Sequence, residues 1–168
     1  MKLVSPAIKM VHKEEEEKMP MPKLVRQTAK TAAEQLMDAL VQTKSSSVSG
    51  KKPFLTSKAC EHIFKYARIN GCTEVKEVVL IFRATRDGWR ANDFHRLCDD
   101  QGPTLCLVQA EEDFMSAGFT SIPWASPEYG NVEDASAMVF ALTGTLQVFK
   151  TKNPKMAVEH HKRAGPCW

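Results

Sequence analysis

The sequence predicts an α+β fold built mainly from antiparallel strands, with a few peripheral helices. After residue 75, segments rich in β-branched and other apolar residues follow one another, and the connections between them are short and carry Gly, Asn, Pro or Asp. Only one helix-like segment, at residues 91–99, lies among them. Strands that follow each other directly tend to pair in antiparallel fashion, so we expect few parallel pairs.

The first 53 residues are predicted to form a basic arm outside this fold. They carry ten Lys/Arg and six Asp/Glu, whereas residues 54–168 carry thirteen and fourteen. Residues 1–22 are charged, rich in Met and Pro and aperiodic, so we expect them to be disordered. The serine-rich stretch at residues 45–53 is typical of a flexible linker.

Within the arm, residues 23–42 predict a helix. Five apolar residues are spaced by 4, 3, 4 and 3 positions: Val25, Ala29, Ala32, Leu36 and Ala39. The pattern covers too few turns for a coiled coil, so we expect a solvated helix that docks lightly on the domain. Removal of residues 1–50 is then expected to have little effect on the stability of residues 54–168.

The domain itself is predicted to begin with a helix at residues 54–68, capped by Thr56 or Ser57. The predicted strands are 78–83, 104–109, 114–122, 137–142, 146–149 and 156–160.

Composition excludes several classes of protein. The longest apolar run, Val78–Phe82, is far shorter than the ~20 residues of a membrane-spanning helix. Ser5, Pro6 and Lys9 interrupt the first ten residues, which argues against a signal peptide. The nearly neutral charge of residues 54–168 argues against a nucleic-acid partner. Five irregularly spaced cysteines do not form a disulfide framework, so we expect an intracellular, cytoplasmic chain.

The stretch from Arg86 to Thr104, "RDGWRANDFHRLCDDQGPT", concentrates residues that can carry chemistry. Asp87 and Gly88 are explained by a turn between a strand and a helix. On that helix, Phe94, Leu97 and Cys98 have the i, i+3, i+4 spacing of an inward face, and Cys98 is then a small core residue. His95 is expected to point partly to solvent or to a backbone carbonyl.

Two functional interpretations of this stretch, a metal site and a cysteine nucleophile, have less support than the structural one. His95 and Cys98 could hold a metal, but no second pair with ligand spacing occurs, and His160 and His161 should point to opposite faces of a strand. A Cys98 nucleophile would lie at a helix C-terminus beside Asp99 and Asp100, which raises the pKa of a thiol. The aspartate pair is itself typical of a solvated turn. The sequence therefore predicts no catalytic residue, no metal site and no cofactor.

The same stretch carries a resemblance to a known family. "LIFRATRDGWRANDFHRLCDDQGPTLCLVQ" resembles the central signature of the TLDc domain, with its Arg-Asp-Gly turn, Phe-His helix, Cys-Asp pair and Gly-Pro-Thr strand start. "GFTSIPW", "DASAMVFALT" and "HHKRAGPCW" resemble later blocks of the family in the same order. The resemblance covers about residues 54–168. It implies a TLDc-type β-sandwich whose C-terminal strands are absent from this chain.

For function, the resemblance implies a non-enzymatic protein-interaction domain. Members are associated with protection from oxidative damage, and some regulate the vacuolar-type proton pump. The expected contact residues are Arg86, Asp87, Trp89 and Arg90, although partial burial of Trp89 is the favoured interpretation. Arg90 stands where the family often has a helix-capping Ser or Thr, so the following helix is expected to lack its cap.

Two alternatives stay open. One is a thiol-dependent antioxidant enzyme, which needs an exposed cysteine of low pKa. The other is a truncated chain without function of its own, whose uncovered sheet would invite aggregation.

Overall fold

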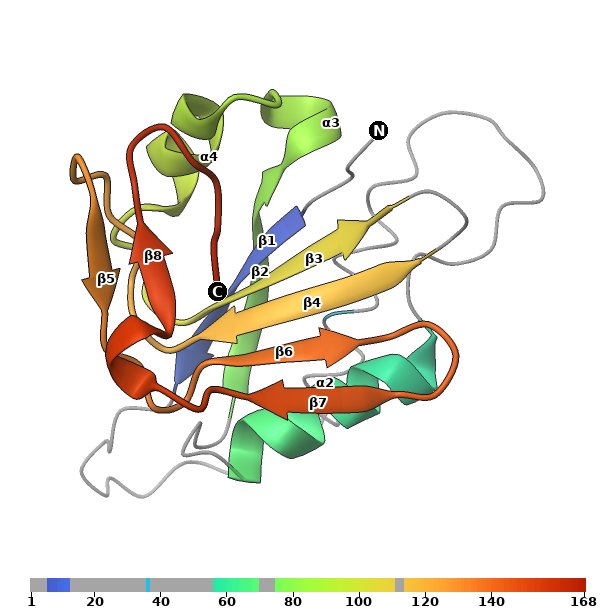
Figure 1. Cartoon of the computed structure of the whole chain (residues 1–168). Coiled ribbons are helices and arrows are strands. Elements are labelled where there is room, and N and C mark those ends of the chain that lie inside the picture. Colours follow the sequence, from blue (N-terminus) through green and yellow to red (C-terminus); the bar gives the residue numbers. More distant parts are fainter. Residues whose placement is uncertain (1–5, 13–35, 37–55, 70–74, 111–113) are drawn as a thin grey trace, which may run out of the picture.

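A computed structural model describes residues 6–12, 36, 56–69, 75–110 and 114–168 (Figure 1). The described strands form a six-stranded sheet in the order β2-β1-β3-β4-β6-β7 and a two-stranded sheet, β5-β8. All pairs between these strands are antiparallel. The strands are β1 Pro6–His12, β2 Val75–Arg83, β3 Thr104–Gln109, β4 Met115–Thr120, β5 Gly130–Val132, β6 Met138–Ala141, β7 Gln147–Lys150 and β8 Val158–His160.

The predicted α+β class with mainly antiparallel strands is confirmed, with small differences. The predicted helices appear as α2 (Ser57–Ile69) and α4 (Ala91–Cys98). A single helical turn, α3 (Ala84–Asp87), and a 3₁₀ turn, η2 (Pro154–Met156), were not predicted. None of the helices in the described ranges has the length and apolar character needed to cross a membrane.

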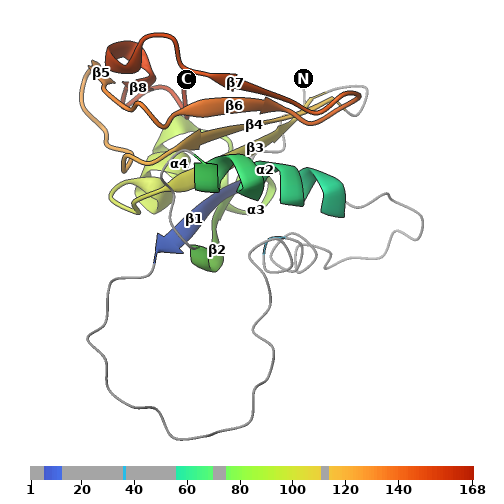
Figure 2. The same cartoon turned by 90° about the horizontal axis from the view of Figure 1, so that it is seen from below.

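Helix α2 covers one face of the large sheet (Figures 1 and 2). It begins as predicted, because the Thr56 hydroxyl accepts the Ala59 N–H at 3.2 Å. Its apolar side packs on alternate residues of the strands, which point to the same face because the side-chain period of a strand is two. The buried residues of this layer include Ile63 and Phe64 of α2, and Leu105, Leu107, Ala117, Phe119, Met138 and Phe140 of the sheet.

The opposite face is covered by α4, by the loop that carries Trp124 and by the C-terminal segment. Figure 1 shows this last segment crossing the sheet before the chain ends at Trp168. The ring of Trp168 lies directly over Gly118, where an added Cβ would come within 2.6 Å of it. Trp124 is buried, and its Nε1–H donates to the Thr104 hydroxyl at 2.8 Å. Aromatic rings therefore fill this second core.

Strand β1 corrects the prediction that the start of the arm is disordered. Residues 6–12 were expected to be disordered, but they lie between β2 and β3 inside the large sheet. Ala7, Ile8 and Met10 are at most 1% exposed. Pro6, Lys9 and the surrounding charges conceal this short alternating run, because its apolar residues are too few for a periodic signal on their own.

A second part of the arm also reaches the core. Leu36 is helical, completely buried and packed in the same layer as Ile8 and α2. The remainder of the predicted helix at 23–42, and the predicted linker at 45–53, lie outside the described residues.

We predict that Ile8→Ala lowers the free energy of unfolding by about 2–5 kcal/mol, because the truncation leaves a cavity in the core. Lys9→Ala, one residue along the same strand and only half-buried, should change it by no more than about 0.5 kcal/mol. Denaturant unfolding of the full chain measures both values. Equal effects of the two changes would contradict the placement of β1.

We also predict that Gly118→Ala destabilises the protein, since the new methyl group must displace the Trp168 ring. Gly130→Ala is the matched control, because an added Cβ at this strand position meets no atom within 4 Å. Thermal unfolding and tryptophan fluorescence should report a lower melting temperature and a shifted emission for Gly118→Ala alone. Unchanged fluorescence in Gly118→Ala would mean that Trp168 does not lie on the sheet.

Candidate functional site

The candidate site is the turn that joins β2 to α4 through α3. Gly88 follows α3 with a φ of 117°, a conformation that L side chains rarely adopt. A Cβ at this position would also stand 2.1 Å from the Oδ2 of Asp93. The turn therefore requires glycine for both conformation and space, as the Arg-Asp-Gly pattern predicts.

Asp87 is more buried than a contact residue was expected to be, because its carboxylate holds the turn together. Oδ2 accepts the backbone N–H of Arg83 at 2.7 Å, and the two oxygens receive the Arg86 guanidinium at 2.7 and 2.8 Å. The side chain is 13% exposed, against 53% for Arg86. The hydrogen bonds from Arg86 hold the pKa of Asp87 below its usual value. The ion pair with Asp87 thus neutralises much of the positive charge of Arg86.

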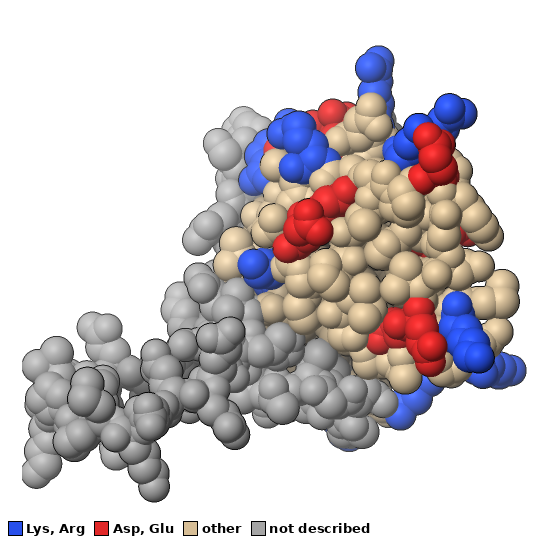
Figure 3. All heavy atoms as spheres, turned by 90° about the vertical axis from the view of Figure 1, so that its left-hand side faces the viewer, with Lys and Arg blue, Asp and Glu red and all other residues tan. Residues whose placement is uncertain are grey.

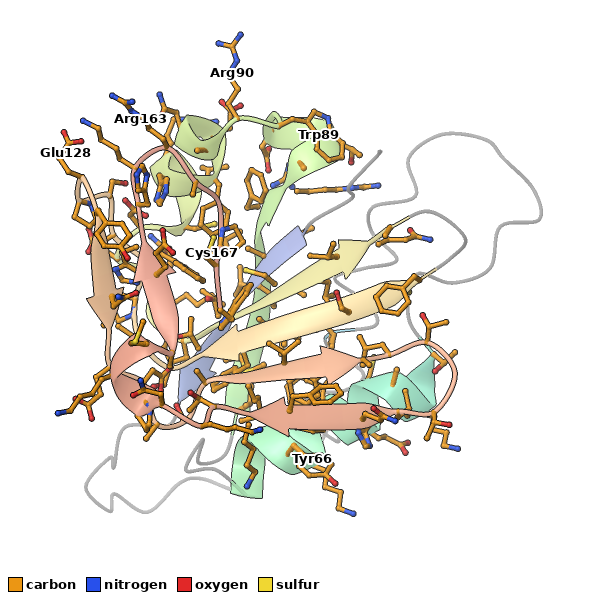
Figure 4. All side chains as sticks on the ribbon, in the orientation of Figure 1. Tyr66, Trp89, Arg90, Glu128, Arg163 and Cys167 are labelled. Carbon is orange, nitrogen blue, oxygen red and sulfur yellow. The ribbon has the colours of Figure 1, made fainter. Side chains whose placement is uncertain are left out.

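Arg90 precedes α4, and the expected loss of the helix cap is only partial. An arginine side chain has no acceptor and cannot cap the helix. Asp93, three residues later, instead accepts the Arg90 backbone N–H at 3.1 Å, which is the second half of a capping box. The Arg90 side chain itself is exposed and points away from the body of the protein (Figure 4).

Trp89 is exposed over about half of its surface and does not belong to either buried core cluster. It is 54% exposed, and Figure 4 places it at the same end of the molecule as Arg90. The tight turn at Gly88 and the start of α4 direct it outward, whereas Phe94, five positions later, fills the core beneath. Sequence patterns could not distinguish the two outcomes, because an aromatic residue in a turn suits either.

The charges on the side of the molecule that carries β5 are mixed. Figure 3 shows side chains of both signs around a broad uncharged area on the face it presents. On the same part of the molecule Lys162 pairs with Glu128. No continuous basic stripe is visible on the described surface of that face.

His95, in the middle of α4, connects this helix to the C-terminal segment. It is 7% exposed. Its Nδ1 lies 2.7 Å from the Oδ1 of Asp99, and its Nε2 lies 2.9 Å from the carbonyl oxygen of Ala164 and 3.1 Å from that of His161. Of the two expected alternatives, solvent or a backbone carbonyl, the structure shows the contact with a backbone carbonyl. The tie to a turn 66 residues away is a tertiary feature that local spacing does not encode.

Ser126 extends this cluster, but the arrangement does not form a catalytic triad. Its hydroxyl donates to the Oδ2 of Asp99, not to the imidazole. A triad needs the histidine between the serine and the aspartate, with its second nitrogen free to take the serine proton. Here the aspartate lies in the middle, and Nε2 of His95 faces two carbonyl oxygens. The cluster fixes the end of α4 and offers no activated nucleophile.

A second polar cluster is also structural. Asp134 is buried and accepts hydrogen bonds from the hydroxyls of Thr120, Ser121 and Ser136, at 2.7, 3.0 and 2.5 Å. Burial alone would raise the pKa of Asp134, but these hydrogen bonds outweigh it and leave the pKa below its usual value. Only the local pair Asp134–Ser136 could have been read from the sequence, since an aspartate often bonds the backbone two residues on.

The described cysteines are poor nucleophiles. Burial raises the pKa of Cys60 to about 11 and that of Cys98 to about 12, and it raises the pKa of Cys106 well above its usual value. Cys167 is half-buried, and burial together with Glu159 raises its pKa as well. The predicted burial of Cys98 is confirmed. Cys72 lies outside the described residues.

Two adjacent histidines have different surroundings. His160 is buried beside Trp124, whereas His161, just beyond β8, is half-exposed beside Tyr129. Burial lowers the pKa of His160. Among the residues that the structure describes, no three His, Cys, Asp or Glu side chains are grouped as metal ligands.

We predict that His95→Ala and Cys98→Ala change stability without abolishing any turnover. Losing the His95 hydrogen bonds should cost about 1–3 kcal/mol, and the small Cys98 cavity about 1 kcal/mol. His161→Ala is the control, because it keeps the carbonyl that His95 contacts. The measurements are denaturant unfolding, peroxide consumption and ester hydrolysis. Turnover by the parent chain that a folded variant lacks would contradict this view.

The sequence also matches a known family of domains. Residues 48–165 of the 168-residue chain match the TLDc domain family. No curated protein and no solved structure matches the chain. The family match includes the β2–α4 turn, the His95 cluster and every described strand except β1. The chain therefore belongs to the TLDc domain family.

Proposed function

We propose that this chain is a non-enzymatic protein-interaction domain, and that the β2–α4 turn is its contact surface. The observation that carries the proposal is the exposure of Trp89 on a turn whose backbone N–H groups at Arg83 and Arg90 are held by Asp87 and Asp93. Trp89 and Arg90 make the contact, while the paired Arg86 and Asp87 hold the turn and border it.

Physical reasons favour this surface over a chance exposure. Tryptophan and arginine are the residue types most enriched where interface residues dominate the binding energy. The turn is anchored by Asp87, by Asp93 and by the glycine conformation at Gly88, so binding a partner costs little ordering of the backbone. Arg90 offers exposed donors suited to a carboxylate of a partner.

The competing proposal of a thiol-dependent antioxidant enzyme has less support. Such an enzyme needs a thiolate at neutral pH, and the raised pKa values of Cys60, Cys98, Cys106 and Cys167 oppose its formation. Protection from oxidative damage is therefore better proposed as the indirect result of a protein contact.

The partner proposed from the family resemblance is the vacuolar-type proton pump. A regulatory contact of this kind would place the chain inside the cell, at the cytoplasmic sector of the pump. It requires no cofactor, no metal and no catalytic side chain.

We predict that Trp89→Ala and Arg90→Ala each weaken binding to the purified cytoplasmic sector of the pump by about tenfold or more. Phe149→Ala is the matched control, because Phe149 is also 54% exposed but lies on β7, at the opposite end of the molecule (Figure 1). Binding is measured with immobilised full-length chain, and circular dichroism checks the fold of each variant.

Two results would count against the proposal. If the parent chain binds and both turn variants bind equally well, the contact surface is wrong. If the parent chain shows no binding to the pump, this partner is wrong.

A further inference from the structure

Strand β1 fills a gap that is one strand wide. It is hydrogen-bonded to β2 on one side and to β3 on the other, and the described strands contain no direct β2–β3 pair. All seven residues of β1 pair with β2, and Ala7, Ile8 and Lys9 also pair with β3. Without β1, each neighbour would present a row of unpaired N–H and C=O groups toward the gap.

The gap also has specific requirements for side chains. Ile8 and Met10 enter the core layer under α2, whereas Ala7 enters the aromatic core on the other face, beside Phe82 and Cys106. Lys9 is only half-buried. The gap thus accepts an extended segment in which a small residue is followed by a large apolar one. The third position accepts different side chains, and the fourth requires a large apolar residue again.

This strand does not belong to the part of the chain that defines the family. The family match begins at residue 48 and includes both neighbours of β1, which lies entirely before it. Residues 13–56, 44 residues in all, separate His12 from the first residue of α2. In its relation to the matched segment, β1 therefore resembles a peptide that adds a strand to a sheet, a recurring mode of peptide recognition.

We infer that the gap between β2 and β3 is a strand-binding site, that residues 6–12 are its ligand within the same chain, and that this strand leaves and rebinds as a unit. The ligand class is an extended apolar segment recognised by backbone hydrogen bonds on both edges and by the pockets for Ile8 and Met10. The covalent connection raises the local concentration of β1 and keeps the site occupied.

The test uses the full chain with a recognition sequence for a site-specific protease inserted between Lys18 and Met19. After cleavage of the folded protein, we expect residues 1–18 to stay bound through size-exclusion chromatography. An excess of fluorescent synthetic peptide 1–18 should then replace them. The peptide with Ile8→Asp and Met10→Asp should bind at least about a hundredfold more weakly, because the site would bury two unpaired carboxylates.

A peptide with Lys9→Glu is the control and should bind within about threefold of the parent peptide, because that side chain is only half-buried. Two results would overturn the inference. One is a cleaved protein that loses residues 1–18 and keeps its melting temperature, which would mean that the gap needs no strand. The other is a cleaved protein that admits the labelled peptide only on global unfolding, which would make β1 a fixed part of the fold.

Discussion

The large sheet is apolar on both faces, and this constraint shapes the rest of the molecule. Alternate residues of β1 and β3 enter two separate cores, one beneath α2 and one beneath α4 and the C-terminal segment. A sheet of this kind must be covered on both sides and must keep its backbone groups paired along its width. Strand β1 meets both needs, because it joins the edges of β2 and β3 and contributes side chains to each core.

The second face holds α4, the helix that follows the candidate site, in place. Phe94 anchors α4 against Phe82 and Trp124 with edge-to-face ring contacts at 5.5 and 5.6 Å. His95 and Asp99 then tie the same helix to the C-terminal turn and to Ser126. The polar residues that look most reactive in the sequence therefore join α4 to neighbouring segments. The turn before α4 is held by separate hydrogen bonds, in which Asp87 accepts the Arg83 N–H and Asp93 accepts the Arg90 N–H.

Many features could be predicted from local patterns. The cap at Thr56, the strand at 104–109, the inward Cys98 and the requirement for Gly88 depend on periodicity or on turn chemistry within a few residues. The motif order from Arg86 onward was sufficient to indicate the family. The direction of Trp89 was not predictable, because a turn residue next to a helix can face either side. Strand β1 was missed because seven residues with one lysine and one proline carry a weak signal.

What the sequence by itself determined is the antiparallel α+β class, most of the elements between residues 57 and 160 but not α3, β5 or η2, and membership of the TLDc family. These depend on short-range spacing, which the chain carries wherever it folds. Only the tertiary structure decided that residues 6–12 occupy the middle of the sheet and that His95 bonds to carbonyls 66 and 69 residues away. Such pairings depend on which strand edges and carbonyl oxygens have no partner once the other elements have packed. A local sequence pattern contains no information about these distant partners.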